Sequence, residues 1–178
     1  MDGTTGGSRL GTDPAAPAAA AAVDANAADA AGAAGAPLGR MGIAALSLVG
    51  LLISAYMSLY KLGVFGRIAC GAGDCDRVQN SPWAVFLGVP VPYIGVLGYG
   101  ALIVVAIAGM QPGHARARWV SVLLLTGATI GLAFSAYLTW LEAAVIHAWC
   151  RYCIVSAALA TLIFLCSIPE IRRLRRDP

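Results

Sequence analysis

The sequence predicts an all-α integral membrane protein built as a bundle of four spanning helices. Its 178 residues are 59% hydrophobic and 12% charged, with a mean hydropathy of +0.76. Such a composition is too apolar for a soluble domain that must cover itself with charge. Four apolar stretches are each long enough to cross a hydrocarbon core, which needs roughly 20 helical residues. Arginines gather at alternate ends of these stretches, as expected for a multi-pass chain.

The first 38 residues differ from the rest of the chain. Residues 1–38 are dominated by Ala, Gly and Pro with scattered Asp, and they contain no aromatic residue. Such a segment offers too little apolar surface to offset the loss of chain entropy, so we expect a disordered tail. The alanine run Ala18–Ala22 could form a transient helix, and no positive cluster precedes it, so a cleaved signal peptide is not expected.

The four spans are predicted from length and apolar content. They cover about Met41–Lys61, Pro92–Met110, Trp119–Leu141 and Cys150–Ile168. All should be helices, because a spanning segment must satisfy its own backbone hydrogen bonds. Pro90 and Pro92 suit the first turn of the second span, where a missing N–H costs nothing.

Basic residues predict the orientation of the bundle. One side carries the arginines Arg40, Arg116, Arg118, Arg172, Arg173, Arg175 and Arg176. The other side carries Lys61, Arg67, Arg77 and Arg151, partly balanced by Asp74 and Asp76. The positive-inside rule then places both termini in the cytoplasm and the protein in the inner (cytoplasmic) membrane. We therefore expect a membrane domain over residues 39–170 and a basic cytoplasmic tail over 171–178.

Four of the five cysteines lie on the predicted extracytoplasmic side. They form two pairs, Cys70 with Cys75 in a loop and Cys150 with Cys153 where the fourth span begins. Pairs in an oxidising compartment suggest disulfide chemistry. The helix dipole and the adjacent Arg151 should favour the thiolate of Cys150, which makes it the reactive member of its pair. Cys153, one turn deeper, should face the membrane interface, where a lipid-soluble oxidant can reach it.

The loop pair has neighbours that suit a mobile shuttle. Gly71, Gly73 and Asp74 leave the backbone free to move, so a loop sulfur could swing between an outside protein and the inner pair. Two pairs in series could then relay electrons through mixed disulfides. Two structural disulfides, or a zinc ion held by all four thiols, would use the same residues. Spacing alone leaves these three interpretations open.

At these positions the chain closely resembles the vitamin K epoxide reductase family, over about Met41–Ile168. The resemblance is carried by the loop pair, the segment Cys75–Trp83 (CDRVQNSPW), the Gly88-Val-Pro90 that leads into the second span, and the Cys-x-x-Cys that opens the fourth span. Taken in this order the features are specific, whereas the Cys-x-x-Cys alone is a weak signal.

The resemblance implies a quinone pocket near the outer end of the bundle, capped by a short half-helix at about 76–81. By position, Cys153 matches the quinone-facing cysteine and Cys150 its partner in an active-site disulfide. Cys75 matches the shuttle that attacks Cys150, and Cys70 the thiol that meets the protein substrate. Ser81 matches a serine at the active site, and Trp83 is the tryptophan expected at the quinone.

The implied activity is that of a quinone-dependent thiol-disulfide oxidoreductase that generates disulfides in exported proteins. Its cofactor would be a menaquinone or ubiquinone from the membrane pool. Some bacterial members carry a fused thioredoxin-like domain, but this chain ends eight residues after Glu170. The expected partner therefore acts in trans as an exported thioredoxin-fold dithiol oxidase of the DsbA type. The rival interpretation is a non-enzymatic membrane module or transporter subunit with two structural disulfides.

The sequence departs from the family pattern at three places. The loop cysteines have only four residues between them, Pro92 stands where many bacterial relatives have serine, and Ala157 stands where vertebrate members have a tyrosine that contacts the vitamin. Vitamin K epoxide is therefore not the expected substrate.

Several further residues can be interpreted either as functional or as having only a structural or interfacial role. Glu142, near the outer end of the third span, is either an intramembrane functional acid or a group that faces water. His147 could hold a proton or simply lie at the interface. Trp83, Trp140 and Trp149 could line the pocket or anchor the bundle in the interface, and Cys166 is expected to be a free thiol without a redox role.

Overall fold

The computed structural model describes residues 15–176 except 65, 67, 72 and 116, and it describes side chains from Leu38 to Arg175 with the same exceptions. The long helices are α1 (Ala15–Lys61), α3 (Val91–Met110), α4 (Arg118–Leu141) and α5 (Arg151–Arg176). The short elements are α2 (Cys75–Gln79), η1 (Pro82–Ala84), β1 (Val85–Phe86), β2 (Val89–Pro90) and η2 (Glu142–Ile146). The chain has two compact units, Met1–Ala34 and Gly35–Pro178.

The N-terminal segment differs from the expected disordered tail. The structure has residues 15–34 of the first unit as helix, and α1 continues through the second unit to Lys61. Alanine has the highest helix propensity of all residues, which explains a helix in a segment that has no apolar face to pack. Residues 1–14 of the expected tail lie outside the described residues.

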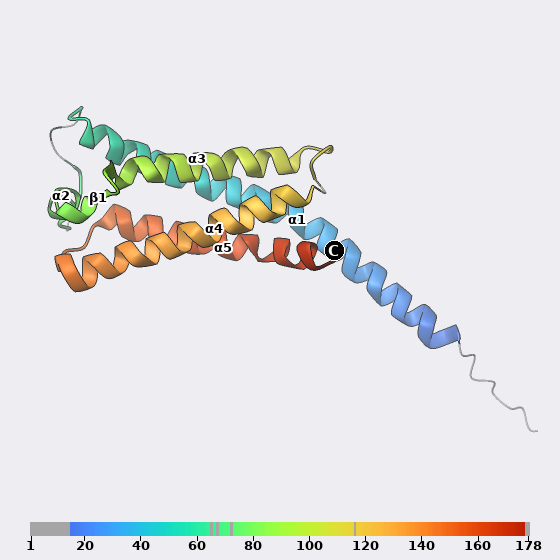
Figure 1. Ribbon diagram of the computed structural model, residues 1–178. Helices are drawn as coiled ribbons and strands as arrows, with labels where there is room; N and C mark the ends of the chain where they lie inside the picture. The colour runs from blue at the N-terminus through green and yellow to red at the C-terminus, as the bar shows by residue number, and fades with distance from the viewer. Residues whose placement is uncertain (1–14, 65, 67, 72, 116, 177–178) are drawn as a thin grey trace, which may run out of the picture. The chain divides into compact units, whose positions relative to one another are not determined.

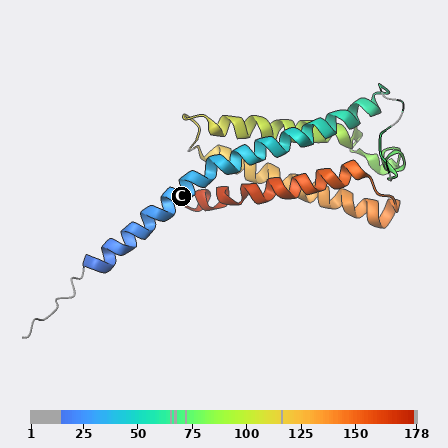
Figure 2. The same cartoon turned by 180° about the vertical axis from the view of Figure 1, so that it is seen from behind.

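Within residues 35–178 the four long helices run side by side, and this confirms the predicted bundle (Figures 1 and 2). Four helical segments are long and apolar enough to span a membrane: Leu38–Lys61, Val91–Met110, Arg118–Ile146 and Arg151–Arg175. Their central core takes buried side chains from all four, including Ile43, Tyr99, Leu124 and Ile163. Pro92 falls in the first turn of α3, as the sequence predicts.

The outward faces of the helices are as apolar as the core. Large apolar side chains are more than half exposed on every helix, for example Leu52, Leu97, Ile130 and Leu165. A surface of this kind is stable only in lipid, because in water it would be a very large exposed apolar patch. The chain is therefore a multi-pass membrane protein.

One end of the bundle is covered by the segment between α1 and α3 (Figure 1). We call it the cysteine end, because Cys70, Cys75, Cys150 and Cys153 lie there. The expected half-helix is present as α2, which begins one residue and ends two residues earlier than predicted. Two side chains of α1 hydrogen-bond to it. Lys61 Nζ donates to the backbone oxygen of Gln79, and Tyr60 Oη donates to Asp76 Oδ1 at 2.9 Å.

A two-residue hairpin completes this cover. β1 and β2 pair antiparallel, with Phe86 opposite Val89. Leu87 and Gly88 form the turn, with φ of 51° and 82°. Two successive positive φ angles are typical of the type I′ turn, whose twist matches that of the strands it joins. The sequence analysis does not predict this hairpin.

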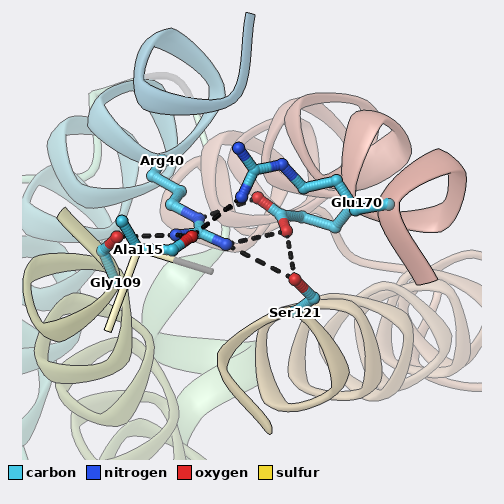
Figure 3. A network of polar contacts seen from close by, with 6 residues as sticks. Arg40, Gly109, Ala115, Ser121 and Glu170 are labelled. Atoms are coloured by element: carbon cyan, nitrogen blue, oxygen red, sulfur yellow. Dashed lines mark hydrogen bonds and ion pairs between the residues drawn. The ribbon is translucent and has the colours of Figure 1, made fainter. Parts of the chain in front are cut away.

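The opposite end, which we call the arginine end, is closed by a buried ion pair (Figure 3). Arg40 Nε donates to Glu170 Oε1 at 2.8 Å, and both side chains are 2% exposed. The same guanidinium donates to the carbonyl oxygens of Gly109 at 2.6 Å and Ala115 at 2.9 Å. Ser121 Oγ also donates to the Glu170 carboxylate. This one network therefore joins α1, α3, α4, α5 and the loop between α3 and α4.

Candidate active site at the cysteine end

The four predicted cysteines come together at one place. Cys70 and Cys75 form a disulfide, whereas Cys150 and Cys153 are free thiols. Cys70, Cys75 and Cys150 belong to one buried apolar cluster, and Cys153 packs against it. The two pairs are therefore neighbours, as the relay requires. Because Cys70 is bonded to Cys75, these four cysteines do not form the alternative four-thiol zinc site in this structure.

The loop that carries the first pair is held against the start of α5. Asp74 N–H donates to the Trp149 carbonyl at 3.1 Å, and Tyr152 Oη donates to the Ala69 carbonyl at 2.8 Å. Cys75 is 0% exposed and Cys70 is 8% exposed. The family resemblance implies that Cys70 meets a protein substrate, but in this conformation Cys70 is covered.

Cys150 lies immediately before α5, where the first amides of the helix point outward. Hydrogen bonding from the Cys153 thiol, together with the backbone N–H groups of Cys153 and Tyr152, lowers the pKa of Cys150, although burial acts in the opposite direction. Donors that converge on a sulfur at a helix N-terminus stabilise its thiolate. The helix amides are a cause that the sequence predicts from the position of Cys150, whereas the Cys153 thiol, which has the largest effect, is not.

A large cavity opens between the helices beside Cys153. It has a volume of about 530 Å³ and is lined by all four long helices and by the cover. Its walls are mostly apolar and include the ring pair Phe86 and Phe134, whose centroids lie 5.3 Å apart. Cys153 borders this cavity, whereas Cys70, Cys75 and Cys150 do not. Pro92, where the family pattern is broken, is also a lining residue.

The cover contributes one polar group that the sequence analysis missed. Gln79, at the end of α2, lines the cavity and is 5% exposed. Its side-chain carbonyl oxygen is buried without a hydrogen-bond partner among the described residues. Buried amide oxygens are rarely left unpaired in native proteins, so this one is available to accept a hydrogen bond from a group that enters the cavity. Only its place in the CDRVQNSPW segment could have drawn attention to it.

A second, much smaller cavity lies on the other side of Cys153. Its volume is about 30 Å³, and Ser81, Trp83, Glu142 and Cys153 are among its lining residues. Ser81 Oγ donates to the Val78 carbonyl at 2.7 Å. Ser81 and Trp83, the two further residues expected at the quinone, thus border this small cavity and not the large one.

Glu142 is buried and faces the cysteines. Its side chain is 3% exposed, and its Oε2 accepts the backbone N–H of Cys150 at 3.1 Å. It begins η2, a single π-helical turn that ends α4, and His147 follows in a left-handed conformation with φ of 51°. Such π turns are frequent at functional sites. Of the two interpretations from sequence, the water-facing one is wrong.

Four further residues singled out from the sequence line neither cavity. His147 is exposed, with Nδ1 at 3.2 Å from the Val145 carbonyl. Trp140 and Trp149 are about half exposed and line neither cavity. Cys166 lies near Gly42, in the half of the bundle toward the arginine end, and is a free thiol.

Comparison with known proteins agrees with this geometry. A family model described as the vitamin K epoxide reductase family matches residues 41–168. The thiol-disulfide oxidoreductase LTO1 of Arabidopsis thaliana is 30% identical over 133 residues, which cover 68% of this chain and 34% of that protein. Subunit 1 of the vitamin K epoxide reductase complex of Mus musculus is 29% identical over 142 residues, which cover 71% of this chain and 87% of the mouse protein. The chain thus spans about a third of the Arabidopsis relative.

Proposed function

The chain belongs to the vitamin K epoxide reductase family, and from this premise we propose that it is a membrane thiol oxidoreductase that generates disulfide bonds with a quinone as electron acceptor. One observation carries the proposal. Cys153 borders the cavity of about 530 Å³, while its pair partner Cys150 lies in one buried cluster with the Cys70–Cys75 disulfide. The two pairs therefore connect the loop to the cavity.

The cavity fits a quinone in size and chemistry. A volume of about 530 Å³ lies within the usual range of small-molecule sites, roughly 300–1,000 Å³. The apolar walls suit a ring and a hydrocarbon tail, and the unpaired carbonyl oxygen of Gln79 suits a quinol hydroxyl, which donates a hydrogen bond. A bound quinone would supply the oxidising power, taking two electrons and two protons from a dithiol.

The chain's own residues carry the electrons by two thiol exchanges. A substrate dithiol reduces the Cys70–Cys75 disulfide and becomes a disulfide itself. The Cys75 thiolate then attacks Cys150 of an oxidised Cys150–Cys153 pair, Cys153 leaves as thiolate, and Cys70 closes the loop disulfide again. The result is an oxidised loop pair and a reduced inner pair. This is the redox state found here, with Cys153 at the cavity.

The dithiol substrate is proposed to be an exported thioredoxin-fold oxidase of the DsbA type that acts in trans. Cys70 is 8% exposed, so its loop must move before a partner thiolate can reach the disulfide. The hydrogen bonds from Asp74 to Trp149 and from Tyr152 to Ala69 would have to open. The glycines beside Cys70 make such a movement inexpensive, since glycine tolerates many backbone conformations.

We place the protein in the inner (cytoplasmic) membrane, with both termini in the cytoplasm and the cysteine end outside. The proposal is supported by the arginines that cluster at the other end of the bundle, among them Arg118, Arg172 and Arg173. Only this orientation exposes the cysteine pairs to an oxidising compartment.

The experiment is anaerobic oxidation of a reduced thioredoxin-fold protein by the full chain in detergent, with menaquinone or ubiquinone analogues. We expect turnover to be lost with Cys150→Ser and with Cys153→Ser and to be unchanged with Cys166→Ser, the matched control. In Cys153→Ser, a mixed disulfide between Cys75 and Cys150 should accumulate. Absence of turnover in folded wild type with either quinone, together with two permanent disulfides, would support the structural membrane module and refute the proposal.

A further inference from the structure

Two carboxyl groups are buried in the bundle, and they are satisfied in different ways. Glu170, 2% exposed, is paired with the Arg40 guanidinium and with Ser121 (Figure 3). Glu142, 3% exposed, has no cationic partner in the part of the chain that the structure describes, where Arg40–Glu170 is the one salt bridge. An unpaired buried acid is costly in a membrane protein and marks a functional group by default.

The groups around Glu142 are thiols and a backbone amide. Its Oε2 accepts the Cys150 N–H at 3.1 Å. A carboxylate oxygen of Glu142 and the sulfurs of Cys150 and Cys153 all lie within 4.8 Å of one another. Among the described residues that line the small cavity, Glu142 and Cys153 are the titratable groups, and the others are apolar, serine or glutamine. The titratable neighbours of the carboxyl are therefore the two thiols.

Local backbone geometry places this carboxyl. At η2 the helix widens into a π turn, and the Ala148 N–H returns to the Glu142 carbonyl at 3.2 Å. The chain then reverses through His147, so that Cys150 arrives next to the residue eight positions before it. A neutral acceptor would be enough to hold the Cys150 N–H. A carboxyl adds the ability to take a proton.

We propose that Glu142 is the proton acceptor for the Cys153 thiol. This rests on the proposed function only in that Cys153 must become a nucleophile. In the step, the S–H bond of Cys153 breaks, an O–H bond forms on Glu142, and the electron pair of the broken bond stays on sulfur. No electron leaves the protein. The proton stays on Glu142, beside Cys153, until the sulfur has reacted.

The proton can pass from Glu142 into the small cavity beside it. This cavity of about 30 Å³ is bordered by Glu142, Cys153 and Ser81. It is large enough for a water molecule, which needs about one probe sphere, roughly 10–15 Å³. Ser81 keeps its hydroxyl at this cavity by its bond to Val78. Ser81, which the family resemblance places at the active site, thus borders the same small cavity as Glu142 and Cys153.

The test measures the reactivity of Cys153 without quinone or partner. In the full chain with Cys150→Ser and Cys166→Ser, Cys153 is the free thiol, and its reaction with N-ethylmaleimide is followed between pH 7 and 9. With Glu142 present, the rate should change less than about threefold, because the proton moves within the pair and not to solvent. With Glu142→Gln, the rate should rise about 25-fold over this range, as expected for an isolated thiol with a pKa of about 8.5.

The Glu142→Gln variant is a matched comparison for the parent. The amide oxygen of the new glutamine still accepts the backbone N–H of residue 150, so the start of α5 is retained. Equal pH slopes in the two proteins would overturn the proposal and reduce Glu142 to a structural acceptor. The parent protein, which keeps Glu142, also tests the proposal by itself, since a rise of about 25-fold there refutes it. A flat profile in the parent, found together with no quinone turnover in the wild type, would sustain Glu142 as acceptor while the proposed oxidoreductase function fails.

Discussion

The thiol of Cys150 sits where three donors converge, and this decides its reactivity. The Cys153 thiol and the first amides of α5 lower the pKa of Cys150. A lowered pKa keeps the thiolate present to lower pH than in an ordinary cysteine, and reactivity is lost as the pH falls through that pKa. Cys150 is thus prepared for exchange with Cys75 although it is 0% exposed.

Removing the first of these donors gives a pH prediction. In Cys153→Ala, with Cys166→Ser in both proteins, the pKa of Cys150 should rise because its thiolate loses the neighbouring thiol. Alkylation of Cys150, measured by peptide mass spectrometry against pH, should therefore reach its midpoint at higher pH than in the parent. An unchanged midpoint would mean that the helix amides alone set the reactivity.

Gln79 predicts how the cavity recognises its ligand. Gln79→Leu keeps the size of the side chain but removes the unpaired amide. Losing one hydrogen bond of roughly 1 kcal/mol should weaken equilibrium binding of a short-chain quinone analogue about fivefold to tenfold. Gln111→Leu, the same change at an exposed position beyond α3, should leave binding unchanged. Equal affinities in all three proteins would exclude Gln79 as a ligand.

At the scale of the helix, α3 has two glycines with open space beside them, and only one of these two lines the large cavity. A Cβ on Gly98 or on Gly100 would meet nothing within 4 Å, but only Gly98 lines the cavity. Valine at Gly98 would enter the cavity, and valine at Gly100 would not. Either change should leave the helix intact, because valine is the better helix former of the two residues.

The pair gives a matched experiment on what fills the cavity. Gly98→Val should weaken quinone-analogue binding about tenfold, as expected when extra carbon atoms overfill a site. Gly100→Val should bind like wild type, and neither variant should melt at a lower temperature in detergent. If both bind normally, the ligand does not occupy the α3 side of the cavity.

At the scale of the whole molecule, the arginine end should be the rigid end. Arg40→Met alone leaves the Glu170 carboxylate buried without its guanidinium, which should cost about 3–5 kcal/mol in the free energy of unfolding. The double variant Arg40→Met/Glu170→Leu should recover most of this loss, because it leaves no buried charge. The exposed Arg118→Met should change the same free energy, measured by detergent-induced unfolding, by less than about 0.5 kcal/mol. A harmless Arg40→Met would show that the ion pair adds nothing.

The sequence predicts what depends on local composition, and fails where distant residues meet. The spans follow from hydropathy and are confirmed by the structure, which also brings together the two cysteine pairs that the spacing indicates. The ion pair joins residues 130 positions apart, and no local pattern distinguishes Arg40 from the other flanking arginines. The left-handed Leu87 and the π turn at Glu142 were also missed, because neither residue type favours that backbone. Gln79 was missed because only packing shows that its amide is unpaired.

The arginine end also determines the order in which the protein can be made. Arg40 belongs to the first of the four described spanning helices to leave the ribosome, and its counterion Glu170 belongs to the fourth. Until α5 is inserted, the guanidinium must stay at the lipid headgroups, because a lone charge in hydrocarbon is too costly. The closed bundle can therefore form only after α5 has been made, and a nascent chain stopped before Glu170 would hold its cysteine pairs in a bundle that is still open at the other end.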